Sequence, residues 1–335
     1  MSKLMDKLRT NTTIKAAQLL KDSDFMNNEM VPTDIPAVNI ALSGTICGGL
    51  TSGLTTIAGP SKHFKTAFGL LMMKAYLQSK PNAIALFYDS EFGTPQKYFE
   101  TFDIDMSRVL HSPIMDVEQL KIDIVKQLDE LEKEDEVYIF VDSIGNLASH
   151  KEVQDALDGK MVGDMTRAKS IKSLFRAVTP YLKSKNIPMV VVNHTYDSQE
   201  MFSKPVVSGG TGIYYSSDTI WIVGRRQQKE GSDVTGYQFV INVEKSRYVK
   251  EKSKIPVSVS FDGGIDKWSG LLDMALDAGV ISRSGAWYQL TDLETGEIIE
   301  KKYRAKELVG NDLWNPILKS ESFRNYVKEK YMLVT

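Results

Sequence analysis

The sequence predicts a mixed α/β fold with a mostly parallel sheet, an antiparallel extension of that sheet, and helices on both of its faces. Two observations lead to this fold class. From about Leu54 onward, short and nearly continuous apolar runs alternate with segments of helical period, as in parallel strands covered by helices on both sides. Further along, two segments alternate apolar and polar residues, which indicates antiparallel strands with one solvated face.

The elements follow in a regular order. The apolar strands are expected at 54–58, 83–89, 137–142, 189–193 and 219–223, and the alternating strands at 237–243 and 255–261. Helices are expected at 66–79 and at 117–131, where apolar residues recur every three or four positions and form one buried stripe. The early strands are thus followed by helices, whereas the last strands follow one another directly.

Three parts of the chain differ in pattern. Residues 1–30 are polar with sparse apolar positions, so we expect a helical arm outside the core, the alternative being a frayed terminus. Residues 31–265 are expected to form the core. Residues 266–335 contain a predicted helix at 271–278, a short strand around Trp287 and a turn near Gly296, and are expected to form a small C-terminal α/β domain.

The 335-residue chain has the composition of an ordinary globular enzyme, 42% hydrophobic and 25% charged, which excludes a collagenous or wholly disordered protein. Cys47 is the single cysteine and the four histidines are scattered, so we expect no internal disulfide and no metal-ligand spacing. No apolar run approaches the ~18 residues that span a bilayer, so we expect a cytoplasmic protein with no membrane partner. With a formal charge of -2, binding to nucleic acid requires a local concentration of cations.

A candidate phosphate-binding loop runs Gly59-Pro60-Ser61-Lys62-His63-Phe64-Lys65-Thr66 between the first strand and the first helix. In this setting, backbone N–H groups and the helix N-terminus present partial positive charge to phosphates. Lys65 is expected to contact the β and γ phosphates of a nucleoside triphosphate, and Thr66 to offer its hydroxyl to Mg²⁺. Phe64 stands where the motif has its second glycine, a departure from the strict pattern. The alternative is a chance strand, turn and helix.

Two acidic residues follow buried strands. Asp142 ends the apolar strand 137–142, the position from which a carboxylate holds Mg²⁺ beside the loop lysine. Glu91 follows the strand 83–89, and ligands of α/β folds collect at such strand ends. We therefore expect Glu91 to be the general base that orients the attacking water. The alternatives are that apolar strands ending in Asp are common and that Glu91 is a surface or helix-start carboxylate.

Four segments occur together in an order and spacing typical of one family: the loop, residues 87–93, Asp142-Ser143 and Val192-Asn193-His194. The chain resembles the RecA family of ATP-dependent DNA recombinases over essentially its whole length, and within that family it is most similar to the recombinases of T-even-type bacteriophages. The resemblance implies a RecA-like ATPase core in which Tyr98 stacks on adenine and His194 senses the γ-phosphate of ATP.

Lys245 and Arg247 lie in an alternating segment, so both are expected on one strand face. The resemblance implies that these two cations enter the ATP site of the neighbouring subunit of a filament and act there in catalysis. Arg247 stands where RecA has a lysine. The alternative is an ordinary solvated strand face, since paired surface cations are common.

Two segments, 148–164 and 195–212, lack a clear period, and loops this long are usually functional or disordered. The resemblance implies that both bind DNA. In the second segment the expected DNA contacts are Phe202, Lys204, Gly209 and Gly210.

A basic cluster follows the first of these segments. It contains Arg167 and, on one face of a predicted helix, Lys169, Lys172 and Arg176. These side chains are expected to bind DNA, because phosphate contacts need only a local stripe of cations. A solvated helix face is the alternative.

The resemblance implies a recombinase that uses ATP and Mg²⁺, forms a helical filament on single-stranded DNA and pairs that strand with homologous duplex DNA. Its expected partners are these DNAs, further copies of itself, a phage mediator or loading protein and a single-stranded-DNA-binding protein. The copies are expected to be arranged head to tail, with the helical arm of residues 1–30 serving oligomerisation. Two other classes stay open: a ring-forming RecA-fold helicase or clock-type ATPase, and a nucleotide-regulated binding protein without turnover.

Overall fold

A nine-stranded sheet forms the centre of the computed structural model, which describes residues 3–14, 16–23, 29–160, 166–198, 204–293 and 295–333. The strands of its parallel part are β1 (Gly53–Ala58), β2 (Ile84–Asp89), β3 (Val109–Pro113), β4 (Val137–Asp142), β5 (Pro188–Asn193) and β8 (Thr219–Glu230). The antiparallel extension consists of β9 (Asp233–Lys245), β10 (Lys254–Ser260) and β11 (Gly264–Ile265). The strand order is β11-β10-β9-β8-β1-β5-β4-β2-β3.

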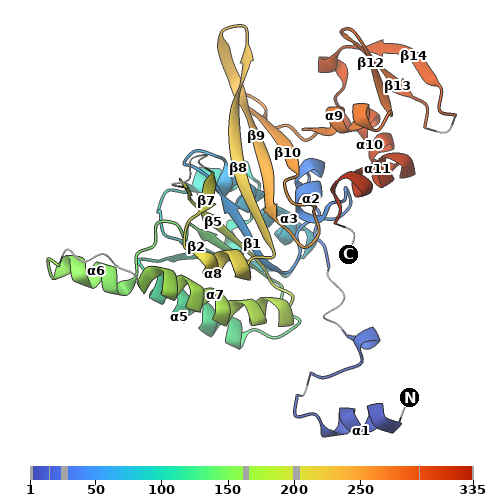
Figure 1. The fold of residues 1–335 in the computed structure, drawn as a ribbon. Helices are drawn as coiled ribbons and strands as arrows, with labels where there is room; N and C mark the ends of the chain where they lie inside the picture. The colour runs from blue at the N-terminus through green and yellow to red at the C-terminus, as the bar shows by residue number, and fades with distance from the viewer. Residues whose placement is uncertain are drawn as a thin grey trace.

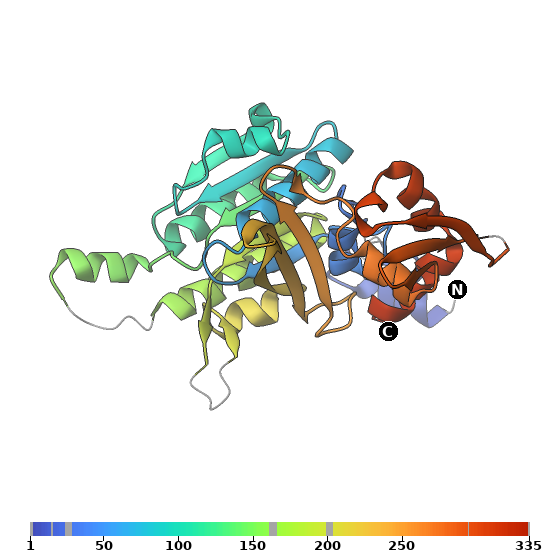
Figure 2. The ribbon, with the colours of Figure 1, turned by 90° about the horizontal axis from the view of Figure 1, so that it is seen from above.

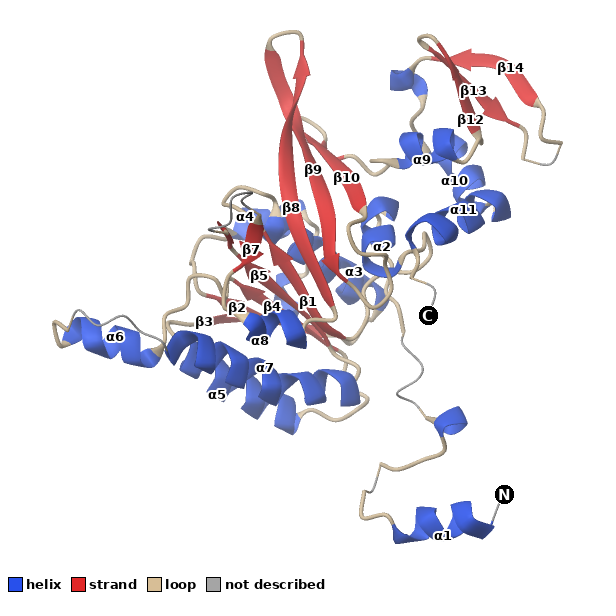
Figure 3. Cartoon of the chain, viewed as in Figure 1, coloured by secondary structure: helices blue, strands red, loops and turns tan. Residues whose placement is uncertain are grey.

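Helices cover both faces of this sheet (Figure 1 and Figure 3). On one face α2 (Pro36–Ser43) and α3 (Lys65–Ser79) share a buried core with alternate strand residues such as Phe140. On the other face α5 (Val117–Glu130) and α7 (Thr166–Ser184) share a second core with residues such as Val141. Adjacent residues of β4 thus point into different cores, as a strand buried on both sides requires. The predicted fold class is confirmed.

The structure differs from the sequence prediction in several elements. β8 does not end near Val223 but continues to Glu230, and with β9 it forms a long hairpin that projects beyond the core (Figure 1). The extension was not predicted because its residues are mostly polar. β3 and α2 were also missed, β3 because its side chains are half-exposed and α2 because all of its residues are buried and show no helical period.

The C-terminal part contains a three-stranded antiparallel sheet with strand order β12-β13-β14. Its elements are α9 (Leu271–Asp277), β12 (Ile281–Ser284), β13 (Trp287–Thr291), β14 (Ile298–Tyr303), α10 (Asn311–Lys319) and α11 (Glu321–Tyr331). The chain then returns to the connection between β9 and β10, because Met332 pairs with Val249 in an isolated bridge.

At the other end of the chain, α1 (Lys3–Asn11) lies apart from the core, and its side chains are exposed (Figure 1). Seen from above, the helix α6 (His150–Leu157) and the C-terminal sheet lie at opposite ends of the molecule (Figure 2). The division into arm, core and C-terminal domain remains a proposal. Over the described ranges, every helix is too short or too polar to cross a bilayer.

Candidate active site

The carboxyl ends of four parallel strands meet at one edge of the sheet. Register places Ala58 of β1 beside Asn193 of β5, and Asp89 of β2 beside Asp142 of β4. The segments that leave these strands enclose a cavity of about 180 Å³. Among its lining residues are Ser61, Lys62, His63, Phe64, Lys65, Thr66, Glu91, Tyr98, Asp142 and His194. Most of the residues predicted to bind ATP are therefore brought to one place.

The phosphate-binding loop connects β1 to α3, with Gly59 and Pro60 at its start. Lys65 and Thr66 are the first two residues of α3, so unpaired backbone N–H groups of the helix N-terminus lie beside them. The Lys65 Nζ donates to Pro60 O at 2.7 Å. Burial lowers the pKa of Lys65, while the nearby carboxylates of Asp142 and Glu91 act in the opposite direction. The Lys65 ammonium and the unpaired backbone N–H groups both attract anions, so this end of the loop suits a polyphosphate.

Phe64, which replaces the glycine of the motif, has φ 61° and ψ 19° and caps the N-terminus of α3. This left-handed conformation is unfavourable for a residue with a Cβ. Its ring stacks on Phe239 of β9 at 4.8 Å and meets Phe68 edge-on at 5.5 Å. The β8–β9 hairpin also holds the loop at a second point, where Arg225 Nη1 donates to Lys62 O at 3.1 Å. Aromatic packing thus offsets the backbone strain at Phe64.

Glu91 is held by two residues whose contact with it the sequence did not reveal. Its Oε1 accepts hydrogen bonds from Ser143 Oγ at 2.6 Å and from Asn146 Nδ2 at 2.9 Å, and His194 Nε2 lies 3.4 Å away. The contacts with His194 and Ser143, together with the charge of Lys65, lower the pKa of Glu91 to about 2, against the effect of burial. Glu91 is therefore ionised at neutral pH and is better suited to orienting a water than to taking its proton.

Asp142 and Thr66 place two oxygens together, with Thr66 Oγ1 donating to Asp142 Oδ2 at 2.6 Å. Burial and the negative charges of Glu91 and Asp89 raise the pKa of Asp142 to about 6, although Thr66 and Lys65 oppose this. A bound cation would reverse that effect. The described residues contain no cluster of three His, Cys, Asp or Glu side chains that suits a metal. Mg²⁺ therefore fits here only with phosphate oxygens and water as its further ligands.

His194 follows β5 and lines the cavity. Its backbone N–H donates to Asn193 Oδ1 at 2.8 Å. The buried Nε2 atom has no hydrogen-bond partner among the described residues. Its distance of 3.4 Å to Glu91 Oε1 is longer than that of an ordinary N–H···O hydrogen bond. A buried ring nitrogen without a partner, on a residue that lines the same cavity as Lys65 and Glu91, fits an oxygen of a bound phosphate.

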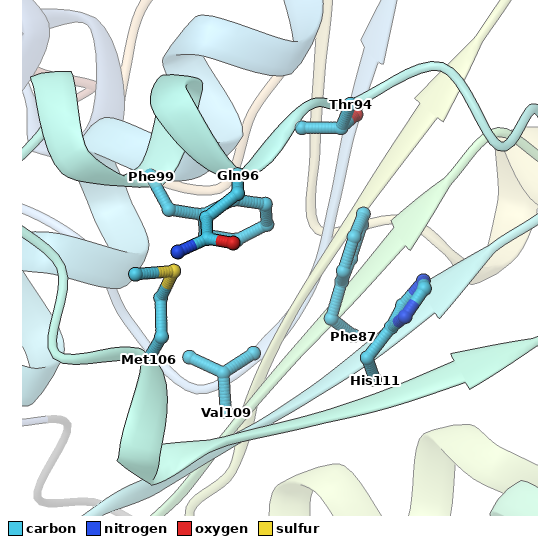
Figure 4. Close-up of a pocket in the computed structure, with 7 residues that line it drawn as sticks. All are labelled: Phe87, Thr94, Gln96, Phe99, Met106, Val109 and His111. Atoms are coloured by element: carbon cyan, nitrogen blue, oxygen red, sulfur yellow. The ribbon is translucent and has the colours of Figure 1, made fainter.

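Tyr98 lies on α4 (Gln96–Thr101), and its partly buried ring reaches the rim of the cavity, where a flat base can stack. A second cavity of about 260 Å³ lies between β2, β3 and the start of α4 (Figure 4). Its lining residues are Phe87, Thr94, Gln96, Phe99, Met106, Val109 and His111. This lining is mainly apolar and shares no residue with the phosphate-binding loop, so it does not belong to the nucleotide site.

The expectation that Lys245 and Arg247 share a strand face is wrong. β9 ends at Lys245, and Arg247 lies beyond it, where the backbone bends. Lys245 Nζ donates to Tyr214 O at 2.8 Å. The guanidinium of Arg247 pairs with the buried carboxylate of Asp218, to which Lys183 Nζ also binds at 2.9 Å. Both cations are therefore engaged within their own chain.

Neither segment expected to bind DNA is wholly irregular. Residues 148–164 include α6, and residues 195–212 include a hairpin of β6 (Thr195–Asp197) and β7 (Pro205–Val207). These elements are short, so their periods were not evident. Lys204 is exposed beside this hairpin, and Phe202 lies outside the described residues.

The basic helix face is present on α7, where Lys169, Lys172 and Arg176 are exposed. Gly209 and Gly210, with φ 93° and 74°, precede α8 (Thr211–Ser216). A Cβ on Gly209 would lie 3.4 Å from Ile171, and one on Gly210 3.8 Å from Ala168, so this glycine turn borders the first turns of α7.

Arg167, grouped with this cluster from the sequence, differs from it. Its guanidinium points inward and donates to backbone carbonyls of residues 144–147, so it does not extend the exposed basic face.

Comparisons with known proteins place this site in a family. Residues 3–266 match the family model described as the RecA N-terminal domain, and residues 268–327 match the C-terminal domain of the bacteriophage T4 recombination and repair protein. The recombination and repair protein of Enterobacteria phage T4 is 53% identical over 99% of this chain and 87% of its own length. The RecA proteins of Thermotoga neapolitana and Bacteroides thetaiotaomicron are 28% and 25% identical, over 91% and 88% of this chain and 85% and 87% of their own.

Proposed function

The chain belongs to the RecA family of DNA recombinases, and from this premise we propose that it hydrolyses ATP as a helical filament on single-stranded DNA. The bound strand pairs with homologous duplex DNA and is exchanged into it. The observation that carries this proposal is the convergence of a buried lysine, an ionised glutamate, an acid beside a hydroxyl and an unpaired histidine around one cavity.

Each of these groups has a distinct role in hydrolysis. Lys65 binds the β and γ phosphates, and Thr66 and Asp142 hold Mg²⁺. When bound, Mg²⁺ neutralises charge on the phosphate oxygens. Glu91, fixed by its hydrogen bonds, orients the attacking water, and His194 donates from Nε2 to the γ-phosphate. Tyr98 stacks on the adenine.

DNA lies along the exposed cations of α7 and the glycine turn before α8. Lys169, Lys172 and Arg176 bind phosphates, and the flexible Gly209-Gly210 backbone approaches the strand closely. Phosphate contacts carry no sequence information, so binding is independent of sequence and pairing between strands supplies homology. Affinity falls steeply with salt because phosphate contacts release counterions.

In the filament, Lys245 and Arg247 leave their partners within the chain and reach the ATP site of the next subunit. Residues 1–30 link the subunits head to tail. In the cytoplasm of the infected host, a phage mediator or loading protein and a single-stranded-DNA-binding protein act with the filament.

The test compares the wild type with Glu91→Gln in ATP hydrolysis and strand exchange. Because general base or orienting groups contribute about 10² to 10⁴ in rate, the variant should retain nucleotide and DNA binding but lose most turnover. Hydrolysis by the wild type that is indifferent to single-stranded DNA, or an unaffected Glu91→Gln variant, would contradict the proposal.

A further inference from the structure

Arg167, at the start of α7, makes an unusual set of contacts. Its Nε donates to Leu147 O at 2.6 Å, and its Nη2 donates to Ile144 O at 3.0 Å and to Gly145 O at 2.8 Å. All three acceptors are backbone carbonyls of one turn, 144–147. Among the described residues, no carboxylate lies within ion-pair distance of this half-buried guanidinium. The three hydrogen bonds of the guanidinium therefore hold the turn 144–147 in place.

That turn directly contacts the candidate active site. It carries Asn146 and follows Ser143, the two residues that donate to Glu91. Gly145 lies against the ring of His194, because a Cβ at this glycine would be 2.4 Å from His194 Cδ2. A displacement of the turn would therefore move both Glu91 and His194, the two side chains proposed to act on the γ-phosphate.

The other end of the connection lies where DNA is proposed to bind. Arg167 is the second residue of α7 and is followed on the same helix by the exposed Lys169 and Lys172. The turn of Gly209 and Gly210 borders the first turns of α7, at Ala168 and Ile171. Phosphate contacts on this part of α7 would shift or order the helix start, and Arg167 would carry that change to the turn.

We propose that Arg167 is a positioning residue that couples DNA bound along α7 to the orientation of Glu91. The coupling rests on the proposed function, since it assumes that Glu91 orients the water and that α7 contacts DNA. Hydrogen bonds from a charged donor are stronger than neutral ones, so three of them make the turn and the helix start move together.

Arg108 provides a matched control. It also donates to three backbone carbonyls, those of Leu77, Lys80 and Ala83, at 2.9, 2.6 and 2.9 Å. Those carbonyls lie before β2, at the opposite end of that strand from Glu91. Arg108→Gln and Arg167→Gln therefore remove similar structural contacts, but only the second removes a connection to Glu91.

The experiment measures ATP hydrolysis by the full chain with and without an oligo(dT) strand, strand affinity by fluorescence anisotropy, and thermal stability. Arg167→Gln should lower the DNA-stimulated kcat about 10- to 100-fold, as misplacement of a reacting group does, with KM for ATP and Kd for the strand within about threefold. Arg167→Lys should recover part of this loss. Arg108→Gln should lose stability but keep its DNA-stimulated kcat within about twofold.

Two results would overturn the coupling. Arg167→Gln with the DNA-stimulated kcat of Arg108→Gln would make Arg167 a purely structural clamp. A loss of strand affinity in Arg167→Gln that accounts for the whole loss of rate would make it a DNA contact instead. A wild type without any DNA stimulation is a different failure, because it would refute the proposed function and this inference with it.

Discussion

Replacing Phe64 with glycine tests how the phosphate-binding loop is held. At φ 61°, glycine would relieve about 1 to 2 kcal/mol of left-handed strain. The change also removes a partly buried ring that stacks on Phe239 at 4.8 Å. A fully buried Phe contributes roughly 3 to 5 kcal/mol, so this ring with its stacking contributes about 3 kcal/mol. We expect Phe64→Gly to be less stable by roughly 1 to 2 kcal/mol, with KM for ATP raised but turnover retained.

The free energy of unfolding is measured by urea denaturation, and KM and kcat by ATP hydrolysis. Phe239→Leu and the double variant complete a cycle, in which the two rings should show a coupling of about 0.5 to 1.5 kcal/mol. A Phe64→Gly variant as stable as the wild type, or two substitutions whose effects simply add, would refute the idea that the hairpin anchors the loop.

Three other substitutions test separate parts of the site. Lys65→Ala should abolish hydrolysis and strand exchange in a protein that still folds, measured by phosphate release and circular dichroism; residual turnover near the wild-type rate would contradict the role of Lys65. Asp142→Asn should change how stability depends on pH. Because the folded-state pKa of Asp142 is raised to about 6, the wild type loses stability as pH rises from about 4 through 6. Without Mg²⁺ the variant should be more stable by up to about 3 kcal/mol at pH 7.5 and by less than about 1 kcal/mol at pH 4. Urea denaturation at both pH values measures this, and a difference independent of pH would be inconsistent with it. The double substitution Lys245→Ala with Arg247→Ala should lower DNA-stimulated hydrolysis by about 100-fold without changing the affinity for a fluorescent ATP analogue; undiminished stimulation would exclude their action on the neighbouring subunit.

The buried strands of the sheet were predictable because their side chains are apolar on both faces. β4 has the predicted bounds, and β2 and β5 differ by one residue at their starts. β3 was not predictable in this way, because as an edge strand it carries His111 and Ser112 among half-exposed residues. The outer part of the β8–β9 hairpin escaped prediction because hydrogen bonding, not apolar burial, holds the two strands together beyond the core.

The main residues of the candidate site follow from the same logic. Lys65, Glu91, Asp142 and His194 each lie at or just after the end of a predicted parallel strand, or open the helix that follows one, and register brings them together. The partners of Glu91 could not be predicted, because they depend on the path of a turn. The orientation of Arg167 depends on that path as well, so the sequence alone grouped it with the exposed cations.

The packing of Phe64 shows a different limit. The sequence identifies it as a departure from the glycine of the motif, but its partner Phe239 is far away along the chain. Only the fold of the β8–β9 hairpin over the loop brings the two rings together.

Electron microscopy of the chain on single-stranded DNA, with Mg²⁺ and a non-hydrolysable ATP analogue, tests the central claim most directly. We expect helical filaments, with nucleotide in the cavity of Lys65, Glu91 and Asp142 and the strand along α7. Closed rings, the absence of any assembly, or nucleotide bound at another place would contradict the account.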